Sequence, residues 1–144
     1  MASINFFSQT LPFKVPFPRK TASWIKSAIR KEKQRLHELN FIFCTDEELY
    51  GINVEYLNHK TYTDIITFDN SEDKGVLEGD IYISVDRVRE NASALSIPFE
   101  TELQRVMIHG VLHLLGYKDK TARHKSEMRK KEDAYLSLYP RASK

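Results

Sequence analysis

Apolar residues recur along the chain with two periods, and the changes between the periods divide it into nine expected elements. Short apolar runs and alternating patterns predict strands at about residues 4–8, 41–45, 63–68 and 79–85. Apolar residues spaced three or four apart predict helices at about residues 20–37, 46–57, 86–95, 99–115 and 121–138. Asp46 and Asp86 are suitable helix caps, and Pro98 introduces the fourth helix.

The order of these elements indicates the fold class. The third and fourth strands are joined by a loop too short for a crossover helix, so they should pair antiparallel, whereas the other strands are separated by helices. We therefore expect an α+β fold, with a small mixed four-stranded sheet packed with about five helices. A chain of 144 residues with 41% hydrophobic content and no internal repeat fits a single domain spanning residues 1–144.

Composition narrows the function classes only slightly. The chain has 22 Lys and Arg residues against 20 Asp and Glu, and a net charge of +2 does not by itself indicate nucleic-acid binding. The single cysteine, Cys44, excludes an internal disulfide and follows an apolar run, which favours a small buried residue over a nucleophile. No segment reaches membrane-spanning length and the N-terminus lacks a signal-peptide pattern, so we expect a cytoplasmic protein with no membrane partner.

Two histidines four residues apart in the fourth expected helix are the strongest chemical signal. On a helix His109 and His113 project from the same face one turn apart, a spacing at which two imidazoles can share one metal ion. Gly116 permits a sharp turn after the helix, which can bring Asp119 back as a third ligand. Two nitrogens and a carboxylate oxygen favour one zinc ion with an open position for water, although nickel, manganese or iron could use the same ligands.

Three alternatives accompany this metal hypothesis. A histidine pair at this spacing also arises in helices that bind no metal, and His124 competes with Asp119 as third ligand. Gly110 occupies the position at which zinc peptidases of the HExxH type carry their general base, so peptide hydrolysis by that mechanism is disfavoured. His37 and His59 have no ligand partner at a suitable spacing and receive no role.

The segment around the two histidines resembles the YbeY family of bacterial rRNA maturation factors. Residues 109–117 follow the family pattern HGxLHLxGY, which continues in the family with Asp-His, and the family's three histidines are its zinc ligands. Here Lys118 and Asp119 stand at those last two positions. Further segments match the family in the stretch from Asn53 to Asp133; they are Asn53, Tyr56, Thr63–Phe68, Gly79–Ser84 and Glu102.

A second departure concerns the residue after Tyr56, where the family carries an arginine thought to contact RNA phosphate. This chain has Leu57, which cannot replace a guanidinium. Either another cation makes the phosphate contact, the candidates being Lys60, Arg87 and Arg105, or nuclease activity is weakened in this branch.

The resemblance implies a function and a fold. It implies a single-strand-specific, metal-dependent endoribonuclease with its metal in a cleft beside the histidine helix. Such an enzyme acts in 16S rRNA 3′ end maturation and ribosome quality control, with an rRNA precursor and the ribosome or a ribosomal protein as partners. The alternative is a non-catalytic ribosome-assembly or RNA-binding factor with a structural zinc. The sequence assigns no residue as general base and leaves the oligomeric state open.

Overall fold

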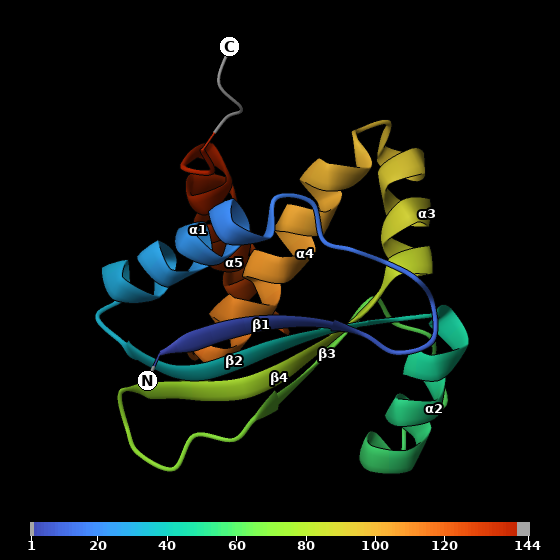
Figure 1. Cartoon of the computed structure of the whole chain (residues 1–144), viewed down its shortest axis with the longest axis horizontal. Coiled ribbons are helices and arrows are strands. Elements are labelled where there is room, and N and C mark those ends of the chain that lie inside the picture. Colours follow the sequence, from blue (N-terminus) through green and yellow to red (C-terminus); the bar gives the residue numbers. More distant parts are fainter. Residues whose placement is uncertain (1, 141–144) are drawn as a thin grey trace.

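The structure is a computed structural model, and it describes residues 2–140 of the chain. It contains four strands and five helices in the expected order (Figure 1). The strands are β1 (Ser3–Ser8), β2 (Arg35–Cys44), β3 (Ile65–Asp69) and β4 (Val76–Ser84). The helices are α1 (Pro18–Lys31), α2 (Asp46–Leu57), α3 (Val85–Leu95), α4 (Phe99–Leu114) and α5 (Ala122–Ser137).

The strands form one mixed sheet in the order β1-β2-β4-β3. Strand β1 pairs with β2 and β2 with β4 in parallel, whereas β3 pairs antiparallel with β4 across the short connection. This arrangement confirms the predicted α+β class and its mixed four-stranded sheet. Strands β1 and β3 therefore form the two edges of the sheet.

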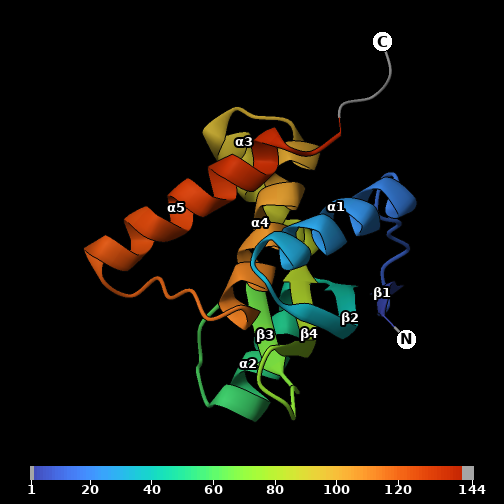
Figure 2. The ribbon, with the colours of Figure 1, turned by 90° about the vertical axis from the view of Figure 1, so that its left-hand side faces the viewer.

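Helices cover the two faces of the sheet unequally. Helices α1, α4 and α5 lie on one side of the sheet and α2 lies on the other, as two perpendicular views agree (Figures 1 and 2). The larger core joins Phe41 and Ile81 on one sheet face to Ile25 of α1 and Met107 of α4, all of them buried. A smaller core under α2 contains Cys44, Leu49 and Ile66.

The observed first helix is shorter than the sequence predicts, and the observed second strand is longer. Helix α1 ends at Lys31 rather than His37, because Lys33 adopts a left-handed conformation with φ 62° that ends the helix. Strand β2 then begins at Arg35, whose backbone pairs with Val76. Leu36 had extended the apolar stripe of the helix, but it belongs to the strand, where a register shift lies between Leu36 and Glu38.

Cys44 is fully buried, as expected for a residue in an apolar run. Burial raises the pKa of its thiol to about 12, with smaller contributions from the carboxylates nearby. A thiol with such a pKa stays protonated at neutral pH and is a poor nucleophile. Among residues 2–140, no helix combines the length and apolar character needed to cross a membrane.

Candidate metal site

The last turn of α4 and the loop after it bring the three predicted ligands together. Helix α4 ends at Leu114, and Gly116 follows with φ 108°, a conformation that favours glycine. The Gly116 N–H donates to the His113 carbonyl at 3.0 Å, and the Tyr117 N–H donates to the Leu112 carbonyl at 3.0 Å. This pair of bonds is a Schellman motif, which reverses the chain and returns Asp119 toward the helix.

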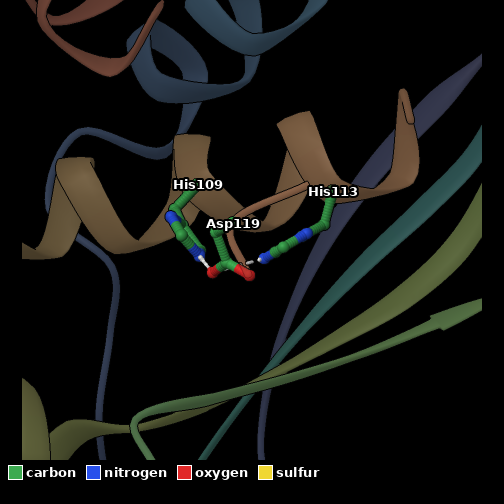
Figure 3. A group of neighbouring side chains, drawn as sticks. All are labelled: His109, His113 and Asp119. Atoms are coloured by element: carbon green, nitrogen blue, oxygen red, sulfur yellow. Dashed lines mark hydrogen bonds and ion pairs between the residues drawn. The ribbon is translucent and has the colours of Figure 1, made fainter. Parts of the chain in front are cut away.

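His109 and His113 point from α4 toward Asp119, which lies between them (Figure 3). One carboxylate oxygen, Asp119 Oδ2, lies 3.3 Å from His109 Nε2 and 3.2 Å from His113 Nε2. One ligand atom from each of the three residues lies within 4.8 Å of those of the other two. Nitrogen and oxygen ligands of a tetrahedral zinc ion lie roughly 3.3 Å apart, so these side chains fit such an ion.

The other nitrogen of each imidazole already has a hydrogen-bond acceptor. His109 Nδ1 donates to Glu132 Oε2 of α5 at 2.6 Å, and His113 Nδ1 donates to the Tyr117 carbonyl at 3.1 Å. A proton held on Nδ1 leaves the Nε2 lone pair of a neutral ring for a metal. Both rings are therefore oriented and set in the tautomer that presents Nε2 to the space beside Asp119.

Glu132 links His109 to a buried network of charges. The residue is 4% exposed, and its carboxylate accepts from Arg105 Nη1 at 3.0 Å as well as from His109. Arg105 Nε also lies 3.4 Å from Glu102 Oε1, although that oxygen has no hydrogen bond of good geometry among the described residues. Arg105 offsets part of the negative charge that burial of Glu132 and Glu102 would otherwise leave uncompensated.

The surroundings of His109 shift its pKa. Burial lowers the pKa of the ring, but the hydrogen bond to Glu132 and the nearby carboxylates outweigh that effect and leave the pKa raised. The same carboxylates that favour a proton on this ring would favour a metal cation in its place.

His124 lies outside this group. Its backbone N–H donates to Thr121 Oγ1 at 3.0 Å in the cap of α5, and the cluster within metal-binding distance contains Asp119 instead. The structure thus brings together the predicted ligands His109, His113 and Asp119, and it places the competing His124 elsewhere.

A cleft of about 400 Å³ opens beside the three residues. It lies between α4, the end of α2, the loop after α2 and strand β3. The residues lining it are Asn53, Leu57, His59, Thr61, Thr63, Asp64, Ile65, Ile66, Thr67, His109, His113 and Asp119. Within residues 2–140 no Lys or Arg lines this cleft. The cleft lining therefore excludes the three cations that the sequence suggested as phosphate contacts, Lys60, Arg87 and Arg105.

Two of those cations are engaged elsewhere. Arg87 Nη2 lies 2.7 Å from Asp46 Oδ2, and Arg105 bonds Glu132. Two further residues, His59 and Asp64, line the cavity although neither is a predicted ligand. Burial raises the pKa of Asp64, opposed in part by the charge of His109. Asp64 belongs to the segment Thr63–Phe68 that matches the family pattern, whereas no local pattern identified His59, which reaches the cleft only through the fold.

The fold and the site together define a class: an α+β protein with a candidate catalytic metal site formed by a histidine pair and a carboxylate beside an open cleft. Comparison with known proteins gives the family. A family model described as Endoribonuclease YbeY matches residues 7–140, and the chain belongs to this family.

Relatives and a solved structure agree with this assignment. A protein of Cytophaga hutchinsonii named Endoribonuclease YbeY is 50% identical over 136 residues, covering 94% of this chain and 95% of the relative. One of Karelsulcia muelleri with the same name is 54% identical over 133 residues, covering 92% and 93%. The solution structure of a Thermotoga maritima protein is similar with a TM-score of 0.69 and 27% identity, covering 94% of this chain and 87% of that one.

Proposed function

We propose that this chain is a metal-dependent endoribonuclease that cuts single-stranded RNA during rRNA processing. The observation that carries the proposal is the arrangement of His109, His113 and Asp119 at one end of a cleft, in a chain whose relatives are named endoribonucleases. The substrate would be an rRNA precursor, cut in 16S rRNA 3′ end maturation, with a further role in ribosome quality control. The protein would act in the cytoplasm and contact the ribosome or a ribosomal protein.

His109, His113 and Asp119 would hold one zinc ion. When bound, such an ion supplies Lewis acidity that lowers the pKa of water and polarises a phosphate oxygen. Glu132 and the Tyr117 carbonyl hold the two imidazoles in the orientation that ligation needs.

Asp64 is the carboxyl group of the cleft that lies outside the metal-binding group. Its side chain accepts from Asn91 Nδ2 at a long 3.5 Å and from its own backbone N–H, which leaves it further capacity to accept. Its raised pKa makes it a better proton acceptor than an ordinary aspartate. In the proposed reaction Asp64 takes the proton of the attacking water.

Gly110 weighs against a peptidase. The residue is buried, and a Cβ at this position would lie 2.7 Å from Ile65 Cδ1 and 3.0 Å from Ile81 Cγ2. A side chain at position 110 therefore points at Ile65 of β3 and Ile81 of β4. The general base of an HExxH peptidase would fit at this position only if the side chains of Ile65 and Ile81 shifted.

The test uses purified protein of known metal content and a single-stranded rRNA precursor. Substitutions His113→Ala and Asp119→Ala should lower both zinc content and the rate of cutting, by at least a hundredfold in rate, because each removes one of three ligands. The matched controls are His124→Ala and Asp73→Ala, which lie outside the cluster and should leave both quantities near the wild-type values. Cutting that persists unchanged in the two ligand variants would exclude the metal-dependent reaction.

The same assay separates the alternative of a non-catalytic RNA-binding factor with a structural zinc. That alternative is favoured by Leu57, which lines the cleft where the family carries an arginine and has no donor for a phosphate. A wild-type protein that binds the RNA tightly but fails to cut it, whichever divalent metal is supplied, would support the binding factor and contradict the nuclease.

A further inference from the structure

Away from the candidate metal ligands, the cleft offers RNA little positive charge. Two carboxylates, Asp64 and Asp119, line it together with neutral side chains. A single strand of RNA carries one negative charge per nucleotide, so its phosphates need hydrogen-bond donors or cations where they enter. Apart from the candidate ligands His109 and His113, one lining residue in the described chain can carry a positive charge, and that residue is His59.

The loop that carries His59 is held in place by α2. The helix ends at Leu57, and its C-cap residue Asn58 adopts a left-handed conformation with φ 56°. The His59 N–H then donates to the Asn53 carbonyl at 3.1 Å, and Asn53 Nδ2 donates to the Thr61 carbonyl at 2.9 Å and to Thr61 Oγ1 at 3.3 Å. The backbone on both sides of His59 is therefore fixed, while its side chain stays exposed at the cleft.

The neighbouring polar groups are less suited to a phosphate. The Asn53 amide is buried and already donates to Thr61, and Thr61 Oγ1 accepts one of those bonds. Leu57, which lies in the same wall, has no donor. An imidazole donates through N–H in both its neutral and its protonated form, so His59 can serve a phosphate oxygen in either state.

We propose that His59 binds a phosphate of the RNA strand in the cleft, as the residue that positions the substrate on the wall formed by α2 and its following loop. The inference rests on the proposed function, since it requires single-stranded RNA as the ligand of this cleft. It assigns the phosphate contact to a residue two positions after Leu57 that lines the cleft, rather than to a Lys or Arg outside the lining.

The experiment compares metal-loaded wild type with His59→Ala and His59→Arg. Binding of a fluorescently labelled single-stranded oligoribonucleotide is followed by stopped-flow anisotropy before cutting begins, and KM and kcat are measured on the same RNA. Loss of a hydrogen bond to a charged group should weaken binding and raise KM by roughly tenfold or more in His59→Ala. His59→Arg should restore most of the affinity, because a guanidinium also donates to phosphate.

His37→Ala is the matched control. His37 is exposed, pairs with Glu78 at 3.0 Å and lies outside the cleft, so its removal should leave RNA binding and KM unchanged. Metal content and melting temperature are recorded for every variant and should stay at the wild-type values.

The outcomes distinguish the two proposals. If wild type cuts RNA but His59→Ala binds and cuts with unchanged constants, the role of His59 is refuted and the nuclease stands. An equal loss of affinity in His37→Ala would also refute it, because the effect would then reflect overall charge. If wild type neither binds nor cuts single-stranded RNA, the proposed function itself fails.

Discussion

Among single residues, Glu132 supports the site without being a candidate ligand or lining the cleft. Glu132 comes from α5 and reaches His109 across the helix interface, where Arg105 holds its other oxygen. The hydrogen bond fixes the ring by its Nδ1 and leaves Nε2 toward Asp119. Replacing the hydrogen-bond partner of a metal-binding histidine typically weakens metal affinity, because the partner sets the orientation and basicity of the ring.

Glu132→Gln should weaken zinc binding by about 10- to 100-fold while the protein stays folded. The glutamine keeps the size of the side chain but removes the charge that favours a cation at His109. Competition with a chromogenic chelator measures the affinity, and Glu127→Gln on the exposed part of α5 is the control. An affinity equal to that of wild type would mean that Glu132 serves only the packing of Arg105.

At the scale of elements, two glycines set how closely α4 approaches the sheet. A Cβ at Gly79 of β4 would lie 2.5 Å from the Phe68 carbonyl oxygen of β3 and 3.1 Å from Leu114 of α4. Gly110 allows the same close approach from the side of the helix. The helix therefore lies against β3 and β4, and this closeness places its histidines at the cleft that β3 borders.

Gly79→Ala should destabilise the fold by about 2 kcal/mol, because the new methyl group meets backbone that cannot move without breaking strand pairing. Gly51→Ala is the matched control: its Cβ would meet nothing within 4 Å on α2, where alanine gains up to about 1 kcal/mol over glycine. Urea denaturation gives both free energies of unfolding. Equal effects of the two substitutions would contradict a steric role for Gly79.

At the scale of the whole molecule, Glu32 ties three distant segments together. The residue follows α1, and its carboxylate accepts from Tyr117 Oη at 2.7 Å in the site loop, from Lys131 Nζ at 2.9 Å in α5, and from the Tyr135 hydroxyl. Tyr117 also gives His113 its carbonyl acceptor. Helix α1 thus helps to hold the loop that carries Asp119.

Glu32→Gln should lower the free energy of unfolding at pH 7 by about 1–3 kcal/mol, because Lys131 loses its charged partner. Burial acts to raise the pKa of Glu32, but its hydrogen bonds and Lys131 outweigh burial and lower it. A lowered pKa in the folded state gives stability that is present above pH 4.5 and is lost as the pH falls through the folded value.

The difference between wild type and Glu32→Gln should therefore shrink as denaturation is repeated at progressively lower pH, below 4.5. Lys26→Gln, an unrelated charge change on α1, serves as the control and should show no such narrowing. A gap that stays constant from neutral to acid pH would show that the charge of Glu32 does not contribute.

Features set by residues close together in the chain could be predicted from the sequence, whereas those set by tertiary contacts could not. Period and capping gave the strands, the helices and the His109–His113–Asp119 group, since all of these are set within a few turns of chain. The boundary between α1 and β2 failed because Leu36 continues the helical stripe and the strand pattern equally well. His59 and Glu132 had no local signal, because each meets the site only through tertiary packing.

The burial of Gly110 also limits how this protein can change through evolution. A single base change converts some glycine codons to glutamate codons, and the substitution would complete an HExxH sequence. The new side chain would nevertheless meet Ile65 and Ile81, so both would have to shift before the acid could fit. One substitution would therefore complete the peptidase motif, but a working peptidase would also need α4 to pack differently on the sheet.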